Sequence, residues 1–469
     1  CDIDSGSESD DKLLPSDEEK SEDTFEGQHC TLTEFKGNCN SDCSDKLRCI
    51  LANWANEEKS IKHACIDRLL TELSGAFNVP KCTATLIDKH ALNIKTMEKG
   101  EYIHFSDWLL NIKHYLELDS YDKSEIKLIV NIDGLNLFNA LSSSKYSSYP
   151  ILVRVEKKEK IFCSGIYCSN SYKSKEMPSP GVLLKEFFND INRANCEDFI
   201  VNGNKVIVKI GAFVCDAPVR AALKNTVLHS GYSSCERCEV VGEYHCHTVV
   251  FLSTSSPERT DDTFSNRKDS SHHKSIEVNE LEIQKIPMVT SFVLDIMHLC
   301  YLGVMKRFLN RLLNLKLKEK NCRLDCRSRK LFDERLLSYQ KYIPSEFPRK
   351  LEGGISTILK WKASQYRLFA LYVGLVLFSC KKVVPSNLYS AFLKFSIALR
   401  LLNTENQGIN INFIQHMLIE FIENCTTIFG PSFVSYNVHS LQHIPQDYIN
   451  YGAKLSAFSF VSYLGSHVK

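Results

Sequence analysis

Two aspartates, each at the end of an apolar run, are the residues of this sequence whose types and spacing best suit chemistry. The runs span 126–133, which ends at Asp133, and 206–216, which ends at Asp216. β-Branched residues dominate both runs, and this predicts two buried strands. Two carboxylates at one edge of a sheet can hold Mg²⁺, which prefers carboxylates and keeps waters and phosphate oxygens as its other ligands. This is the layout of a two-metal phosphoryl-transfer site, although an aspartate at a strand end is more often a turn-former or a helix cap.

A Cys-x-x-Cys follows the second aspartate. Cys235 and Cys238 have the spacing of one half of a tetrahedral Zn²⁺ site, and their surroundings lack the strand-to-helix context of a thioredoxin-like redox pair. The other half has two candidate sources. These are a local pair, His245 and His247, and a remote pair, His439 and His443. We prefer the remote pair, because its i, i+4 spacing puts both imidazoles on one helical face and because it would pin two distant segments together.

Asp295 and His298 form a third candidate constellation. An acid and an imidazole three positions apart lie on one face of a helix, where they can act as a hydrogen-bonded structural pair, as metal ligands or as a DNA contact. We favour the structural role. The sequence has no phosphate-cradling glycine loop, nucleophile elbow or Ser/His/Asp signature.

The composition is that of a globular protein with an acidic start. A length of 469 residues suggests two or three domains, or one core with a large insertion. The 57 basic and 56 acidic residues nearly balance, but the first 26 residues are strongly acidic, so the remainder is net basic. Such a body tolerates a polyanionic partner, which by itself is weak evidence for nucleic-acid binding. A basic segment, 316–330, is as consistent with a solvated helix face as with a DNA contact.

Cysteine usage and hydropathy indicate the compartment. The 19 cysteines are odd in number and scattered, which favours reduced thiols plus a metal site over a secreted disulfide framework. No signal peptide of the usual pattern opens the chain, and the longest apolar run, 368–380, is shorter than the roughly 20 residues that cross a bilayer. We therefore expect a nuclear or cytosolic protein without a membrane partner. Because the chain starts at Cys1 and ends soon after a recognisable motif, we also expect a piece of a longer product.

The elements that must position the candidate residues follow one another along the chain. Residues 1–45 are acidic and Ser-rich, which predicts disorder, and the helical spacing of apolar residues predicts a small helical region over 46–120. From 127 to 214, several strands, a helix and a return strand suggest an α/β sheet. Periodic apolar residues then predict long helices over 292–317 and 359–402.

Several segments follow one another in an order typical of one protein family. They are Asn131–Phe138, Cys215–Ala221, Gly231–Cys238, Arg259–Phe264, Leu294–Leu299, Leu302–Lys306, Trp361–Arg367, Asn437–His443 and Ser456–Gly465. The ordered set resembles eukaryotic DDE transposases of the CACTA/Mirage/Chapaev superfamily and related transposase-domain proteins. The resemblance runs from about residue 47 to the end of the chain and is far more specific than any single segment.

The resemblance implies an α/β fold with an RNase H-like core, a large helical insertion and a zinc site. Asp133 and Asp216 would be the first two catalytic acids and would hold Mg²⁺ or Mn²⁺. Structural Zn²⁺ would be bound jointly by Cys235, Cys238, His439 and His443 and would clamp the insertion onto the core. The expected partners are DNA at transposon ends and further copies of the chain, in the nucleus. The implied divisions are 1–45, 46–120, 121–240 for the first part of the core, 241–430 for the insertion, and 431–469 for the histidine pair and the final core helix.

Two departures from the family pattern decide what we expect of the activity. The family has Phe-Glu-Asn-Tyr-Leu-Gly where this chain has Phe460–Gly465, so the expected third acid is Val461. A second acid of the family, in a Trp-Lys-Ala-Thr-Glu pattern, is Gln365 here. Valine cannot coordinate a hard cation, and the loss of one carboxylate from a shared site should remove the second metal and most of the rate.

We therefore expect a DNA transposase by descent that is catalytically impaired. Asp295 can in principle supply the missing acid, but its spacing from the zinc motif argues against this. The alternative function is a non-catalytic DNA-binding or assembly protein that retains the zinc-braced fold. A zinc-stabilised scaffold without a nucleic-acid role is a third hypothesis.

Overall fold

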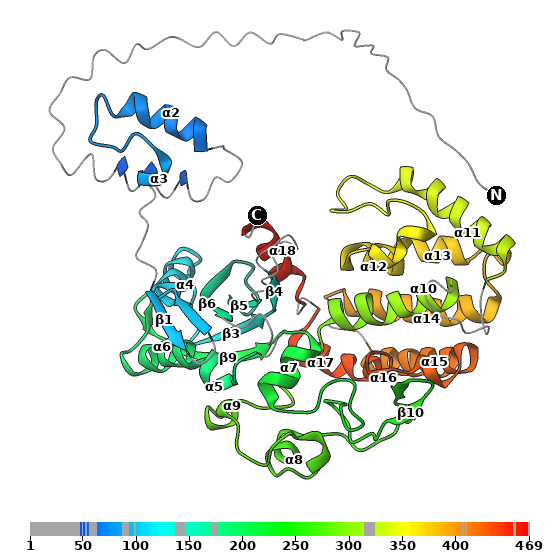
Figure 1. Ribbon diagram of the computed structural model, residues 1–469. Coiled ribbons are helices and arrows are strands. Elements are labelled where there is room, and N and C mark those ends of the chain that lie inside the picture. The colour runs from blue at the N-terminus through cyan, green and yellow to red at the C-terminus, as the bar shows by residue number, and fades with distance from the viewer. Residues whose placement is uncertain are drawn as a thin grey trace, which may run out of the picture. The chain divides into compact units, whose positions relative to one another are not determined.

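The computed structural model describes two compact units, divided after residue 91 (Figure 1). The described residues are 47–48, 50–51, 54–55, 63–86, 93–97, 100–136, 147–169, 177–313, 324–405, 408, 410–453 and 456–467. The acidic segment 1–45 and residues 316–323 of the basic segment lie outside them. Within the described residues, no helix is long and apolar enough to cross a membrane.

The first unit contains helices α2 (His63–Leu73) and α3 (Thr83–Leu86). α2 buries Ile66 and Leu70, which pack with apolar residues from both sides of the helix in the sequence. The Asp67 carboxylate accepts hydrogen bonds of 2.5 Å from both the backbone N–H and the hydroxyl of Thr83. This contact fixes the start of α3 against α2 within the unit.

The second unit is built on a mixed sheet in the order β1-β2-β6-β5-β3-β9, with the short β4 paired to β5. Its strands are β1 (Asn93–Met97), β2 (Gly100–His104), β3 (Glu125–Ile132), β4 (Leu135–Asn136), β5 (Ser147–Val155), β6 (Ile161–Ser169) and β9 (Ile207–Phe213). β3 and β9 run parallel, whereas the other pairs are antiparallel. The expectation of a helical region over 46–120 does not hold for β1 and β2, because β1 pairs with β2 and β2 pairs with β6, and this pairing overrides the local helical spacing.

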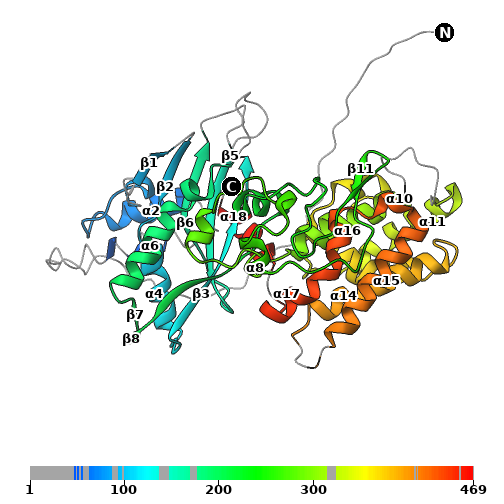
Figure 2. The same ribbon diagram turned by 90° about the horizontal axis from the view of Figure 1, so that it is seen from below.

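Helices cover both faces of the sheet (Figure 2). Leu128 and Val130 of β3 pack with one group of helices, whereas Ile129 between them packs on the opposite face against α18, as the alternation of side chains along a strand requires. The covering helices are α4 (Trp108–Leu118), α5 (Pro180–Leu183), α6 (Lys185–Cys196) and α7 (Ala217–Lys224) on the first face and α18 (Phe458–His467) on the second. The prediction of a mixed α/β protein is confirmed.

A short segment continues the sheet beyond β9. The N–H of Phe213 donates to the carbonyl of Ser291 at 2.7 Å, and the N–H of Val293 donates to the carbonyl of Phe213 at 3.0 Å. Phe213 and Phe292 form a parallel bridge. Residues 291–293 therefore lie parallel to β9, as a third parallel segment after β3 and β9.

Helices make up most of the chain after this segment. Their side chains form one large apolar core rich in phenylalanine. The main helices are the π-helix η3 (Met297–Met305), α10 (Lys306–Leu313), α11 (Cys326–Tyr339), α12 (Ala363–Leu368), the π-helix η6 (Phe369–Val373), α13 (Gly374–Phe378), α14 (Ser386–Leu402), α15 (Ile411–Phe429), α16 (Tyr436–Ser440) and α17 (Ile444–Tyr451). Figure 1 shows α10 to α15 side by side.

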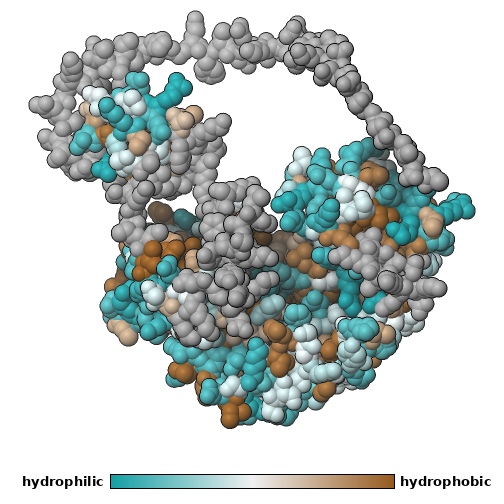
Figure 3. Space-filling view, in the orientation of Figure 1, coloured by the Kyte–Doolittle hydropathy of each residue, from teal (hydrophilic) through white to brown (hydrophobic). Residues whose placement is uncertain are grey.

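Small elements fill the connections of the second unit. They are β7 (Ile200–Val201), β8 (Asn204–Lys205), β10 (Glu243–His245), β11 (Thr248–Val250), α8 (Asp261–Ser265), α9 (Glu280–Ile283) and short 3₁₀ turns at 270–272, 340–342, 355–360, 431–433 and 441–443. On the face shown in Figure 3, hydrophilic and hydrophobic residues are interspersed.

Candidate functional site

Two cysteines and two histidines from distant parts of the chain meet in the second unit. The ligand atoms of Cys235, Cys238, His439 and His443, here called the Cys/His cluster, all lie within 4.8 Å of one another. The two sulfurs are 3.5 Å apart, Cys238 Sγ is 3.3 Å from His439 Nε2, and Cys235 Sγ is 3.7 Å from His443 Nε2. In a tetrahedron with Zn–S and Zn–N bonds of usual length, ligand atoms lie roughly 3.3–3.8 Å apart. The cluster can therefore hold a metal ion, and its donors suit structural zinc.

Burial and neighbouring polar groups prepare the cluster for a cation. Burial raises the pKa of the Cys235 thiol, but the hydrogen bond from Cys238 and the charge of His443 outweigh burial and hold this pKa well below its usual value. The thiolate is the form that binds metal. The side-chain amide nitrogen of Gln442 lies 3.2 Å from His439 Nδ1, whereas Nε2 of the same ring faces Cys238.

The sequence left two histidine pairs open, and the structure places the remote pair at the cysteines. His245 ends β10, and His247 lies in the turn of the β10–β11 hairpin instead. His247 Nδ1 lies 3.4 Å from the Tyr244 hydroxyl. The local pair is not part of the Cys/His cluster.

Three aspartates lie in register at the ends of three parallel segments. Val130 of β3 is paired with Phe213 of β9, and Phe213 is bridged to Phe292. Three residues further along each segment are Asp133, Asp216 and Asp295, respectively. Because carboxyl ends of parallel strands meet at one edge of a sheet, the register brings the three acids to the same edge.

Asp133 and Asp216, here called the acid site, are both half-buried. Burial and the negative charge of Asp216 raise the pKa of Asp133, as expected of two neighbouring carboxylates. Asp216 is also the N-cap of α7, since its Oδ1 accepts a hydrogen bond of 2.9 Å from the N–H of Val219. Among the described residues, no hydrogen bond engages Asp216 Oδ2, so capping leaves this atom for a cation.

Asp295 is fully buried and its carboxylate is occupied by the protein. It accepts hydrogen bonds from His298 Nδ1 at 2.7 Å, from the N–H of Ala457 at 2.9 Å and from the hydroxyl of Ser456 at 3.0 Å. Burial raises the pKa of Asp295, but the hydrogen bond from His298 outweighs burial and lowers it. Asp295 thus forms a structural pair with His298 and holds the start of α18.

His298 lies close to the acid site. Burial lowers its pKa, but the hydrogen bond and charge of Asp295 raise it above its usual value, with further contributions from the charges of Asp216 and Asp133. In its protonated form, which the raised pKa favours, the His298 imidazole offers a donor to an anionic group that reaches the two carboxylates.

Positions 461 and 365, at which the resemblance led us to expect an acid, lie in different surroundings. Val461 is on α18, one turn after Ala457 and beside the buried Phe460, and is 38% exposed. Gln365 lies in the first turn of α12, where its Oε1 accepts from the N–H of Lys362 at 2.8 Å and its Nε2 donates to the carbonyl of Lys350 at 2.8 Å. Glu and Gln are the usual residues at this position of a capping box. An acid at 365 would therefore cap α12.

Sequence reasoning missed a network of buried charged residues between the Cys/His cluster and the acid site. Glu236 and Arg237 stand between the two cysteines, and each has a buried ion-pair partner, Arg220 and Asp447, respectively. Burial raises the pKa of Glu236, but the charges of Arg220 and Lys224 outweigh burial and hold it below its usual value. Charged residues are usually exposed, so nothing in the sequence indicated this burial.

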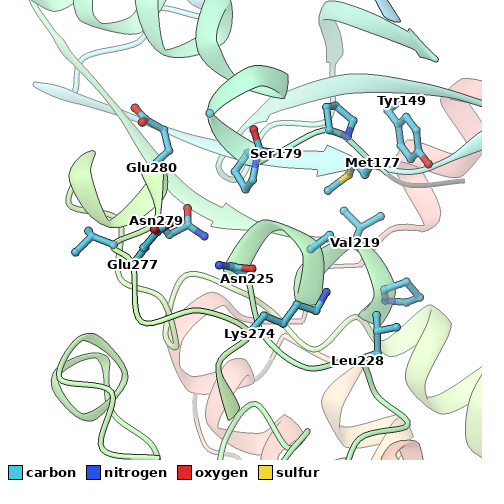
Figure 4. A pocket seen from close by; sticks show the side chains of 16 residues that line it. Tyr149, Met177, Ser179, Val219, Asn225, Leu228, Lys274, Glu277, Asn279 and Glu280 are labelled. Carbon is cyan, nitrogen blue, oxygen red and sulfur yellow. The ribbon is translucent and has the colours of Figure 1, made fainter. Parts of the chain in front are cut away.

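A cavity of about 720 Å³ opens beside the acid site. Pro218 and Val219, just after Asp216, line it together with Tyr149, whose ring lies next to Gly134. Figure 4 shows Tyr149 and Val219 toward one end and Glu277 and Glu280 toward the other. The cavity offers partly apolar space to a group that adjoins one held at the acid site.

Comparisons of this chain with models of protein families and with curated proteins find no match.

Proposed function

We propose that this chain is a transposon-derived protein of the DDE transposase type, similar to the CACTA/Mirage/Chapaev superfamily, with an RNase H-like core. Its ancestral reaction is phosphodiester hydrolysis and strand transfer on DNA. The observation that carries the proposal is the register of Val130, Phe213 and Phe292, which puts the ends of three parallel segments, two of them with half-buried aspartates, at one sheet edge.

The strand order supports the RNase H-like core. Three antiparallel strands, β6, β5 and β3, are followed by β9 and then by residues 291–293, both parallel to β3. This is the order expected of an RNase H-like sheet, and the first two acids follow its central strand and the next parallel one. The helical part inserted before α18 agrees with the insertion that the resemblance implies.

The residues of the acid site have distinct parts in the proposed chemistry. Asp133 and Asp216 would hold Mg²⁺ or Mn²⁺, which activates water or a 3′-hydroxyl and stabilises the leaving oxygen. Asp216 is fixed by its capping bond to Val219. His298, held by Asp295, can donate to a phosphate oxygen at the same edge.

The exposed valine on α18 favours loss of activity in this copy. Val461 offers no ligand at the position where the family has glutamate, and Asp295 cannot replace it freely, because its oxygens already accept hydrogen bonds from the protein. With two carboxylates the site can hold one cation more readily than two. The second candidate function is therefore a non-catalytic, nuclear DNA-binding or self-assembling protein that keeps the zinc-braced fold.

Titration of zinc-loaded protein with Mn²⁺ by calorimetry tests the proposal. We expect one weakly bound Mn²⁺ in the unmodified chain and a second one in Val461→Glu, an exposed position where glutamate is tolerated. The matched control is Gln365→Glu, which should bind no additional Mn²⁺. Failure of both the unmodified chain and Val461→Glu to bind Mn²⁺ would contradict a transposase-type site.

DNA binding separates the second candidate from a scaffold without a nucleic-acid role. Binding through several phosphates weakens steeply as salt rises. A retained affinity for duplex DNA with a steep salt dependence supports the DNA-binding function. Absence of binding at low salt would leave only assembly, which sedimentation analysis measures.

A further inference from the structure

The two residues between the metal-ligating cysteines reach toward the strand ends that carry the acids. Glu236 is 4% exposed and Arg237 is 7% exposed. Each makes a charged hydrogen bond that leads to the backbone at the end of a parallel segment. Each also contacts the segment that carries His439 and His443.

Glu236 connects the Cys/His cluster to the end of β9. Its carboxylate accepts from Arg220 Nε at 2.9 and 3.2 Å. Arg220 Nη1 in turn donates to the carbonyl of Cys215 at 2.6 Å, and Cys215 directly precedes Asp216. One buried arginine thus joins a residue of the metal loop to the backbone next to a residue of the acid site.

Arg237 makes the corresponding connection to the third parallel segment. Its Nη2 donates to the carbonyl of Phe292 and to both carboxylate oxygens of Asp447, the latter at 3.0 Å. Asp447 Oδ2 also accepts from the N–H of Leu294 at 2.8 Å. Leu294 directly precedes Asp295, which holds His298 and the start of α18.

The histidine half of the cluster supplies one partner to each connection. The hydroxyl of Tyr436, on α16 with His439, donates to Glu236 Oε1 at 2.5 Å. Asp447, on α17 just after His443, is the partner of Arg237. The cysteine half and the histidine half of the cluster are therefore joined twice, by Glu236–Tyr436 and by Arg237–Asp447. Both connections also reach the backbone at the strand ends, at Cys215 through Arg220 and at Phe292.

We propose that Glu236 and Arg237 are positioning residues that couple the Cys/His cluster to the acid site. A metal in the cluster fixes the turn between the two cysteines, and the two side chains transmit that order to the backbone before Asp216 and Asp295. Divalent-cation affinity at the acid site then depends on the cluster, although the two sites share no ligand. This inference rests on the proposed function, because it requires that the acid site bind a cation.

A purely stabilising role explains these residues less well. Buried ion pairs cost desolvation and often stabilise a fold no more than apolar residues of the same size. Their several hydrogen bonds to backbone groups at the strand ends are better suited to holding that backbone in one position. Here that backbone carries the candidate ligands.

The test compares three single variants in the zinc- or Co²⁺-loaded chain. Glu236→Gln and Arg237→Met alter the two connections. Tyr436→Phe removes the hydroxyl that donates to Glu236 and accepts from Arg220, without changing charge or volume much. The matched control is Arg259→Met. Arg259 is equally buried and donates to the carbonyl of Cys235 at 3.0 Å, but its guanidinium pairs with Asp269, away from the strand ends.

Two readouts separate coupling from damage to the fold. The Co²⁺ absorption spectrum reports whether the Cys/His cluster is intact, and Mn²⁺ titration reports affinity at the acid site. We expect the spectrum to be unchanged in every variant. Mn²⁺ affinity should fall about tenfold in Glu236→Gln and Arg237→Met, the size usual for groups behind metal ligands, less in Tyr436→Phe, and not in Arg259→Met.

The outcomes distinguish this inference from the proposed function. If neither the unmodified chain nor Val461→Glu binds Mn²⁺, the proposed function fails and the inference fails with it. If the chain binds Mn²⁺ and the affinity is the same in all variants, or falls equally in Arg259→Met, only the coupling is overturned. If Glu236→Gln or Arg237→Met loses the Co²⁺ spectrum, Tyr436→Phe takes its place in the comparison. Unchanged Mn²⁺ affinity in Tyr436→Phe would then count against the proposal.

Discussion

The carboxylate of Asp295 accepts a hydrogen bond of 2.9 Å from the backbone N–H of Ala457, 162 positions later in the sequence. This bond places the first turn of α18 at the end of the third parallel segment. Position 461 lies one turn, about 6 Å, further along that helix. Asp295, which in the proposed function could in principle replace the expected third acid, is thus the residue that anchors the helix carrying position 461.

Replacement of Asp295 should therefore affect stability first. In Asp295→Ala, the N–H groups of Ala457 and His298 lose their buried acceptor, and we expect the free energy of unfolding to fall by about 3 kcal/mol or more. Urea denaturation measures this. The control Ser456→Ala removes one hydroxyl donor to the same carboxylate and should cost about 1 kcal/mol. Equal, small effects in both variants would show that Asp295 does not anchor α18.

Metal content should follow the Cys/His cluster. We expect one Zn²⁺ per chain by atomic absorption, loss of this metal in Cys235→Ser, and a lower thermal midpoint after removal of zinc by a chelator, because the cluster joins two distant segments. The matched controls are Cys246→Ser and His247→Ala in the exposed β10–β11 turn. Both should keep their zinc. Loss of zinc in His247→Ala would instead favour the local histidine pair.

Gln365 should behave as a helix cap. Gln365→Ala removes the acceptor of the Lys362 N–H and should lower the free energy of unfolding by about 1 kcal/mol. Gln365→Glu keeps the acceptor and should leave stability within about 0.5 kcal/mol of the unmodified chain. Thermal unfolding of the two variants checks this, and a large loss in Gln365→Glu would argue against the capping role.

His272 should make the protein less stable in acid. Its Nδ1 donates to the carbonyl of Ser233 at 2.7 Å, its Nε2 is buried without a partner among the described residues, and burial with the charge of Arg259 lowers its pKa to about 3. Since the pKa is lower in the folded than in the unfolded state, the unfolded chain takes up the proton first as pH falls. Stability is retained above about pH 6.5 and lost between about 6.5 and 3.

The size of this loss of stability follows from the difference between the pKa of His272 in the folded and in the unfolded state. By pH 5 the contribution of His272 should amount to about 2 kcal/mol. His272→Gln can still donate to Ser233 but cannot titrate, so the difference in unfolding free energy between the two proteins should change by this amount from pH 7 to 5. An unchanged difference over that range would contradict a neutral, buried His272.

The sequence by itself identified the strands that precede Asp133 and Asp216, the mixed α/β class and the cysteines of the metal cluster. Each of these features is local: β-branched runs favour strands wherever they occur, and two cysteines three positions apart can chelate one ion in a turn. The i, i+4 spacing of His439 and His443 likewise showed that they could act together, though not with which partner.

Only the tertiary structure decided which groups meet across the chain. The choice of His439 and His443 over His245 and His247, the burial of Asp295 under α18 and the pairs Glu236–Tyr436 and Arg237–Asp447 all join segments roughly 150 or more residues apart. Local spacing constrains neighbours one turn or one strand position away, whereas such contacts depend on how the helical part packs against the sheet. Burial of a charged side chain depends on the same packing, because only its partner offsets the cost of desolvation.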